Sequence, residues 1–138
     1  MKTLPKYLIY IVEDDDDDRL MLQQALQAQA TSCIIHAFND GAELFTRLTH
    51  QLDGRLPDLI FLDLETPVMN GFDTLKLLKQ TPPYQRIPVI MRTGHVTLEA
   101  INRCYELGCQ AYLTKDEFGA PLMRLIEEQS QGAFQEPT

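Results

Sequence analysis

The chain has 138 residues, of which 44% are hydrophobic, so it is long enough for one domain with one core and too short for two. Acidic residues outnumber basic ones 20 to 12, and the formal net charge of −8 disfavours direct binding to nucleic acid or to an anionic membrane surface. We expect a single domain over residues 1–138, with a core from about 6 to 130 and a frayed tail over 131–138.

The cysteines and the N-terminal segment indicate the compartment. Cys33, Cys104 and Cys109 are odd in number and lack the Cys-x-x-Cys spacing of zinc sites, so we expect them to be reduced and buried. The apolar stretch near the N-terminus is only about six residues long, too short for a signal-peptide core or a membrane span. These features predict a cytoplasmic protein.

Five short runs of aliphatic or β-branched residues alternate with longer segments of helical periodicity. This alternation is typical of strand–helix units on a parallel sheet, in which helices cover both faces. The predicted strands are residues 7–12, 33–38, 59–62, 88–91 with a continuation to Arg92, and 111–114.

Helical segments separate the predicted strands. The first helix is marked by Leu20, Leu22, Ala25 and Leu26. Asn39 or Asp40 is placed to cap the second helix, which runs through Leu44 and Leu48. Further helices are predicted over 71–79, over 97–107 with Gly108 as a left-handed cap, and over 121–128 with Pro121 in the first turn.

Right-handed crossovers between such units predict a doubly wound α/β fold, a three-layer α/β/α sandwich. Ligands of this architecture bind at the carboxyl ends of the strands. The residues at or just past the strand ends are Glu13, Asp14, Asp63, Thr93 and Lys115. We therefore expect these five side chains to lie at one edge of the sheet.

The chemistry of these five residues suits a phosphoryl group. Three carboxylates at close range repel unless they share a hard divalent cation such as Mg²⁺. A lysine and a hydroxyl facing the same carboxylates can spread the charge of phosphoryl oxygens. An aspartate can itself accept the group as an acyl phosphate.

Five consecutive aspartates follow the first strand, and they are not equivalent. Asp14, at the strand end, is the candidate metal ligand. Asp16, Asp17 and Asp18 fall where a helix begins, where capping and the helix dipole favour negative charge, so we expect them to be solvated. Asp15 fits either role.

The segments YLIYIVEDD, PDLIFLDLETPVMNG, IPVIMRTG and AYLTKDEF occur in this order and span nearly the whole chain. In these motifs the chain resembles the receiver domain of the two-component response-regulator family. The resemblance implies a flavodoxin-like fold with a five-stranded parallel sheet, strand order 2-1-3-4-5, and five helices.

The resemblance also implies a metal site and a phosphoacceptor. Asp63 would accept the phosphoryl group. Glu13 and Asp14 would be the acidic pair that holds Mg²⁺ together with Asp63, and the backbone carbonyl of Glu65 would be a further protein ligand.

Other matching residues would couple phosphorylation to the surface. Thr93 would be the switch hydroxyl, Lys115 the ion-pairing partner of the phosphoryl group, and Tyr112 the aromatic residue whose position reports activation. The turn after the phosphoacceptor and the small residue beside the switch hydroxyl are matched by Pro67, Gly71 and Gly94.

By this resemblance the chain is a stand-alone phosphorylation switch and not an enzyme, apart from self-catalysed phosphorylation and dephosphorylation. A histidine kinase or a phosphotransfer protein would be the donor, and a protein target of unknown identity would read the altered surface. The family's signalling face, from the fourth helix, fifth strand and fifth helix, would here offer Tyr105, Tyr112 and Met123. The same face could join two copies in a homodimer.

Some residues depart from the family pattern. Thr66 replaces a common methionine, and Asp116 replaces the proline after the lysine, so we expect a trans peptide bond there. Arg92 replaces an aliphatic residue; we expect its head to reach the surface, or alternatively to pair across a dimer or partner face. His95 and Glu65 occupy variable positions that adjust the lifetime of the phosphoryl group.

Two other classes of function are weighed. A haloacid-dehalogenase-like phosphatase would explain the segment IFLDLET, but the acidic pair here precedes it, and little chain remains for a substrate cap. A flavodoxin-like binding module needs a phosphate loop after the first strand, and the run of aspartates would repel phosphate there.

Overall fold

The computed structural model describes residues 7–29, 33–50, 53–94 and 97–117, together with 124, 127 and 128. The strands are β1 (Tyr7–Val12), β2 (Cys33–Phe38), β3 (Leu59–Asp63), β4 (Val89–Thr93) and β5 (Ala111–Thr114). The helices are α1 (Asp16–Gln29), α2 (Gly41–Thr49), α3 (Gly71–Gln80) and α4 (Leu98–Glu106), and a short 3-10 helix, η1 (Pro82–Tyr84), precedes β4.

The five predicted strands are confirmed with small shifts of their ends. β3 extends to Asp63, and β4 begins after Pro88 and includes Thr93, which was expected just past it. Four α-helices lie within the described part of the chain. Of the fifth helix, predicted over 121–128, only Arg124, Glu127 and Glu128 are described, and they have helical backbone. The remaining residues of that helix, and the tail over 131–138, lie outside the described residues.

All strand pairs are parallel, and the strand order is β2-β1-β3-β4-β5, as predicted. The register places Asp63 beside Arg92 and Thr93 beside Thr114 at the carboxyl ends of neighbouring strands. This pairing puts the polar strand ends at a single edge of the sheet.

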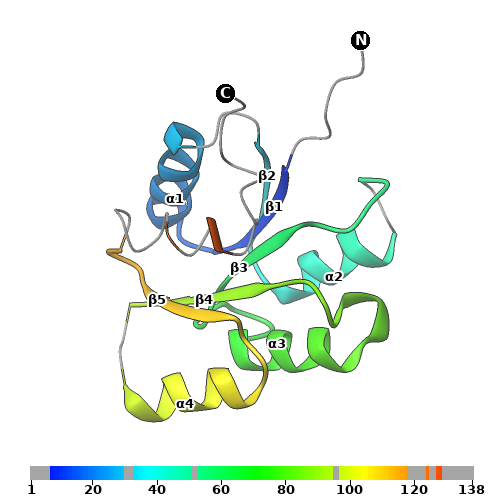
Figure 1. The fold of residues 1–138 in the computed structure, drawn as a ribbon, viewed down its shortest axis with the longest axis vertical. Coiled ribbons are helices and arrows are strands. Elements are labelled where there is room, and N and C mark those ends of the chain that lie inside the picture. Colours follow the sequence, from blue (N-terminus) through cyan, green and yellow to red (C-terminus); the bar gives the residue numbers. More distant parts are fainter. Residues whose placement is uncertain are drawn as a thin grey trace.

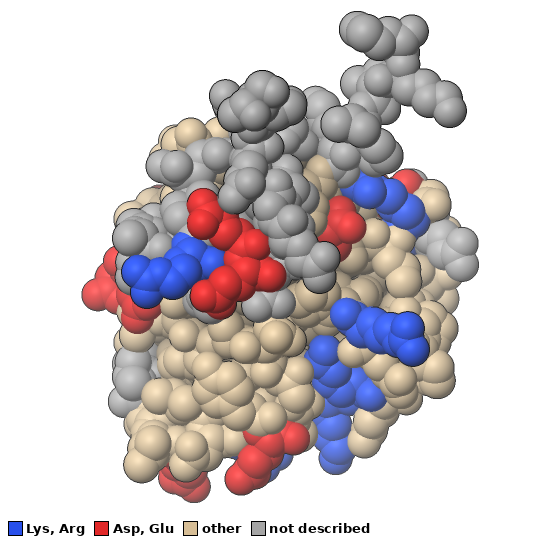
Figure 2. Space-filling model, viewed as in Figure 1, with Lys and Arg blue, Asp and Glu red and all other residues tan. Residues whose placement is uncertain are grey.

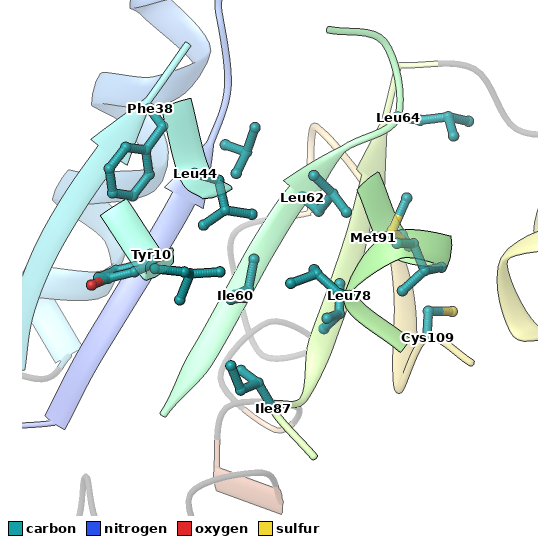
Figure 3. Close-up of a cluster of buried hydrophobic side chains, with 14 of the residues drawn as sticks. Tyr10, Phe38, Leu44, Ile60, Leu62, Leu64, Leu78, Ile87, Met91 and Cys109 are labelled. Carbon is teal, nitrogen blue, oxygen red and sulfur yellow. The ribbon is translucent and has the colours of Figure 1, made fainter. Parts of the chain in front are cut away.

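Helices cover both faces of the sheet, which gives the three layers (Figure 1). On one face α1 buries Leu22 and Leu26 against Ile9, Ile11 and Phe61. On the other, α2, α3 and α4 pack on a larger core. Figure 3 shows part of that core, with labelled side chains that include Tyr10, Phe38, Leu44, Ile60, Leu62, Leu78 and Met91. A sheet buried on both faces explains why its strands are nearly continuous apolar runs.

Side-chain caps fix where the helices begin. The Asp15 carboxylate accepts a hydrogen bond from the Asp18 amide at 2.8 Å, so Asp15 caps α1. Asp40 caps α2 through the Glu43 amide, which decides between the two residues considered for that position. After α4, Gly108 has φ of 101°, the left-handed conformation predicted for it.

Two expectations from composition can be compared with the structure. Cys33, Cys104 and Cys109 are buried and outside any disulfide, as predicted. Across the described segments, none of the helices combines the length and the apolar character that a membrane crossing requires.

Candidate functional site

At the carboxyl ends of β1, β3 and β5, one lysine lies close to three carboxylates. The Lys115 ammonium lies 3.0 Å from Glu13 Oε1, 3.2 Å from Asp63 Oδ2 and 3.1 Å from Asp18 Oδ2. Glu13 and Asp63 are buried, whereas the Lys115 side chain is 20% exposed. The site is therefore a cluster of opposite charges at the edge of the sheet that the sequence indicated.

Three carboxylates at this edge are close enough to share a cation. Glu13, Asp14 and Asp63 each offer one oxygen, and these atoms lie within 4.8 Å of one another. Glu13 Oε1 is buried and, among the described residues, receives no hydrogen bond, although the Lys115 ammonium is within ion-pairing distance. Oxygen donors of this kind, one of them not hydrogen-bonded, fit a hard divalent ion.

Burial shifts the pKa values of the two buried acids. Burial, reinforced by the Asp63 charge and opposed by Lys115, raises the pKa of Glu13 to about 7. Burial also raises the pKa of Asp63, and the Lys115 charge opposes that shift. For Lys115, burial alone would lower the pKa, but the hydrogen bond to Glu13 and the Asp63 charge raise it above its ordinary value. The site thus retains a charged lysine, and its two buried acids keep their protons to higher pH than free carboxyl groups do.

The turn after β3 holds the Asp63 carboxylate in place. Asp63 Oδ1 accepts a hydrogen bond from the Glu65 amide at 3.2 Å. The Thr66 hydroxyl donates to the Met69 carbonyl at 2.6 Å, so the residue that departs from the family pattern closes this turn internally. Gly71 is required at its end, because a Cβ there would lie 2.6 Å from the Asp63 carbonyl oxygen.

Thr93 and Tyr112 are neighbours on β4 and β5. Thr93 is fully buried at the end of its strand, and its side chain hydrogen-bonds with that of Tyr112. The Tyr112 ring is partly buried against the core formed with α3 and α4. The two predicted switch residues are therefore in direct contact.

Asp18 was expected to be a solvated helix residue, and that expectation is wrong. Asp16 and Asp17 are exposed, but Asp18 is only partly exposed and its carboxylate contacts Lys115. The cap at Asp15 starts the helix so that Asp18, in its first turn, faces the loop after β5. The spacing from the cap was the only signal in the sequence that could have identified it.

Arg92 was expected to reach the surface or to pair across an interface, and both expectations are wrong. Its side chain is 2% exposed, and its guanidinium points into the site, with Nη1 3.8 Å from Glu13 Oε1. Its Nη2 donates a hydrogen bond to the Lys115 carbonyl at 3.2 Å. The sequence carries no local signal for this contact, because its partners, Glu13 and Lys115, follow other strands.

The loop after β5 has a trans Lys115–Asp116 bond, as expected without proline. The Thr114 hydroxyl donates to the carboxylates of Asp116 and Glu117, and the Glu117 amide donates back to the Thr114 carbonyl at 3.2 Å. Asp116 therefore shapes this loop by a hydrogen bond where the family uses a proline.

In Figure 1, β5 runs toward the left of the view, so its carboxyl end and the site lie on that side. Figure 2 shows acidic side chains at the left margin of the surface. The surface over β4 and β5 carries few charges in this view. Tyr105 on α4 is 50% exposed. His95 and Met123, which were considered for tuning and for the signalling face, lie outside the described residues.

Sequence comparison identifies the relatives of the chain. A model of the response regulator receiver domain matches residues 9–127. The DNA-binding transcriptional regulator NtrC of Escherichia coli is 34% identical over 131 residues, which cover 90% of this chain and 26% of NtrC. The chain thus spans about a quarter of the length of that relative. The response regulator Rcp1 of Synechocystis is 29% identical over 126 residues, covering 89% of this chain and 86% of Rcp1.

Solved structures of similar proteins have the same fold. The Mn²⁺-bound form of Rcp1 has a TM-score of 0.77 and 27% identity, with 96% of this chain and 97% of that chain covered. The phosphorylated cyanobacterial phytochrome response regulator RcpA has a TM-score of 0.79 and 26% identity, with the same coverage. Both matches extend along almost the full length of the solved chains.

Proposed function

The chain belongs to the response regulator receiver domain family, and from that premise we propose that Asp63 is the aspartate that accepts its phosphoryl group. Receiver domains are phosphoacceptor signalling domains and not classical enzymes. The observation that carries the proposal is the Asp63 carboxylate, buried between the Lys115 ammonium and the Glu13 carboxylate at the ligand-binding edge of the sheet. Membership of this family favours neither the phosphatase nor the flavodoxin-like binding module as the function of the chain.

In the proposed transfer, an Asp63 oxygen attacks the phosphorus of a phosphohistidine on the donor. An oxygen–phosphorus bond forms at Asp63, the nitrogen–phosphorus bond breaks, and the released imidazole takes up a proton. Lys115 lies where it can pair with the oxygens of the transferred group. The Glu65 amide, which donates to Asp63 Oδ1, keeps the carboxylate oriented toward the edge.

A divalent ion belongs to this site, and we propose that it is Mg²⁺. Glu13, Asp14 and Asp63 would hold it, with the backbone carbonyl of Glu65 as a further ligand. When bound, the ion neutralises negative charge on the carboxylates and on the phosphoryl oxygens. The Mn²⁺-bound form of Rcp1 supports a divalent ion in a relative of this chain.

We propose that Thr93 is the residue that responds to the phosphoryl group. Its hydroxyl hydrogen-bonds with Tyr112 in the present structure, so a phosphoryl group at Asp63 would compete for it. A group at Asp63 shifts the conformational equilibrium only by what it binds better in one state. Release of Tyr112 from Thr93 would change the surface formed by α4 and β5.

The proposed setting follows from this chemistry. A cytoplasmic histidine kinase or phosphotransfer protein would donate the group, and a second protein, or a second copy of the chain, would bind the altered face of α4, β5 and the fifth helix. We further propose that the chain forms one receiver domain with a core from about residue 6 to 130, since residues 9–127 match the family model.

Labelling by a small phosphodonor tests this function. Wild-type protein, Asp63→Asn and the control Asp73→Asn would be incubated with acetyl phosphate and Mg²⁺, and their intact masses measured. Asp73 is exposed on α3, so its substitution makes the same chemical change away from the site. We expect one phosphoryl adduct in the wild type and the control, and none in Asp63→Asn or in EDTA. Equal labelling of Asp63→Asn would refute the proposal.

A further inference from the structure

Arg92 is a second cation of the site, built into the sheet itself. Among the largest fully buried side chains it is the only charged one in the described part of the protein. Its guanidinium lies between Glu13 Oε1, at 3.8 Å, and the carbonyl of Lys115, to which it donates at 3.2 Å. It therefore connects the end of β1 to the loop after β5.

The two cations of the site differ in their freedom to move. Lys115 is a flexible, partly exposed ammonium that contacts three carboxylates at once. Arg92 is a planar group, 2% exposed, anchored within β4, and a guanidinium keeps its charge over the whole physiological range. When a ligand enters, Lys115 can exchange partners, whereas burial and the hydrogen bond to the Lys115 carbonyl hold Arg92 beside Glu13.

We propose that Arg92 is a fixed counter-ion of Glu13 that weakens divalent-cation binding at the carboxylate cluster and stabilises the cluster in its metal-free form. The inference rests on the proposed metal site at Glu13, Asp14 and Asp63. In this proposal, Arg92 determines how strongly the stability of the carboxylate cluster depends on a bound metal ion.

The electrostatic reason is the shared use of Glu13. A divalent ion held by Glu13, Asp14 and Asp63 has to approach a carboxylate that already faces a buried positive charge at 3.8 Å. Like charges at this range repel, and burial leaves little water to screen them. Without the ion, the same guanidinium offsets part of the repulsion between Glu13 and Asp63.

A purely structural role for Arg92 makes the opposite prediction. If the guanidinium only filled space and tethered the Lys115 carbonyl, any substitution would loosen the site and weaken metal binding. The counter-ion role instead predicts that removing the charge tightens metal binding while it destabilises the metal-free protein. The sign of the change separates the two.

Calorimetric titration with Mg²⁺ at about pH 8.5, where protons compete little with the ion for carboxylates, measures whether binding tightens or weakens. Arg92→Gln removes the charge and keeps an N–H donor for the Lys115 carbonyl, and Arg92→Lys keeps the charge. Arg47→Gln is the matched control, because Arg47 forms its ion pair with Asp53 and not with a site carboxylate. Arg92→Met, which matches the aliphatic character usual in the family, is a second neutral variant should Arg92→Gln not fold.

We expect Mg²⁺ to bind roughly fivefold more tightly to Arg92→Gln or Arg92→Met than to the wild type. Arg92→Lys and Arg47→Gln should stay within about twofold of the wild type. In EDTA the neutral variants should melt at lower temperature than the wild type, and Mg²⁺ should raise their melting temperature by more.

Unchanged or weaker Mg²⁺ binding in both neutral variants would overturn the inference, as would equally tight binding in Arg92→Lys. Failure of the proposed metal site would look different. In that case the wild type would bind Mg²⁺ no better than Asp14→Asn does. Tighter binding in the neutral variants, lost again in the double variant with Asp14→Asn, supports both the site and the role of Arg92.

Discussion

The Lys115 ammonium lies 3.2 Å from the Asp63 carboxylate, although the two residues are 52 positions apart in the chain. Asp63 ends β3 and Lys115 follows β5, and β4 lies between these strands. The lysine therefore reaches across the end of β4 to neutralise the buried acids. This reach makes Lys115 both a stabilising residue and a partner for a group bound at Asp63.

Replacement of Lys115 by methionine should destabilise the metal-free protein. The change leaves Glu13 and Asp63 buried with less compensating charge, and we expect a loss of about 1–3 kcal/mol in the free energy of unfolding. Lys76→Met on the exposed side of α3 is the control and should change it by less than about 0.5 kcal/mol. Urea titrations in EDTA measure both, and equal losses would contradict the assigned role.

Stability of the metal-free protein should fall as the pH rises from about 4.5 to about 7. Burial raises the pKa of Glu13 from 4.5 to about 7, so in this window the folded state holds a proton that the unfolded state has released. The raised pKa of Asp63 acts in the same direction. The lowered pKa of Asp53 adds no slope here, because its contribution is lost only below its ordinary value of 3.8.

Glu13→Gln removes the carboxyl group that holds this proton in the folded state, so the stability of the variant should depend less on pH. Chemical denaturation in EDTA at several pH values measures the slope for both proteins. A wild-type stability that increases across the window, or an identical slope in Glu13→Gln, would show that Glu13 does not titrate as its burial implies.

Thr93→Ala and Tyr112→Phe each remove one hydroxyl of the same hydrogen bond, but their effects should differ. Beryllofluoride mimics the acyl phosphate, and the Thr93 hydroxyl is the proposed contact for it. Thr93→Ala should weaken beryllofluoride binding about tenfold, which corresponds to one charge-assisted hydrogen bond. Tyr112→Phe frees that hydroxyl and should bind as well as the wild type or better. Fluorine NMR titration distinguishes these outcomes, and equal weakening in both variants would exclude the competition between Tyr112 and the phosphoryl group.

Gly71→Ala should disturb the phosphoacceptor turn. A Cβ at Gly71 would lie 2.6 Å from both the Asp63 carbonyl oxygen and the Leu64 Cα, and these backbone atoms can give way only by moving β3. We expect a loss of about 1–3 kcal/mol in stability, together with slower labelling at Asp63. Gly94→Ala is the control, because a Cβ there meets no atom of the described residues within 4 Å, and its melting temperature should stay near the wild-type value. A stable Gly71→Ala would mean that the turn is less tightly packed than its contacts indicate.

The strands and the edge that carries the site could be predicted because burial on both faces imposes long apolar runs. A charged residue that ends such a run, like Asp63, then marks the carboxyl end of its strand. Parallel pairing brings these ends together, so Glu13, Asp63 and Lys115 could be placed near one another before their distances were known. Strand ends shifted by one residue, as at Thr93, because hydrogen bonding to the neighbouring strand decides the last pair.

The contacts of Arg92 and Asp18 could not be predicted from local sequence. An arginine in an apolar strand usually reaches the surface, but here Glu13 and the Lys115 carbonyl are partners that favour an inward guanidinium. The contact of Asp18 depends on the helical phase set by the Asp15 cap and on Lys115, which is 97 positions away in the chain. Both contacts are tertiary, and both add charge compensation to the same site.

The central claim, that Asp63 carries the phosphoryl group, is tested most directly by trapping the labelled residue. Borohydride reduces an acyl phosphate to an alcohol and leaves free carboxylates unchanged, so peptide mapping after reduction identifies the acceptor. With acetyl phosphate and Mg²⁺, we predict reduction at Asp63 alone and none when either reagent is omitted. Reduction at Asp14 or another carboxylate, or a phosphoryl adduct that leaves Asp63 intact, would contradict the account.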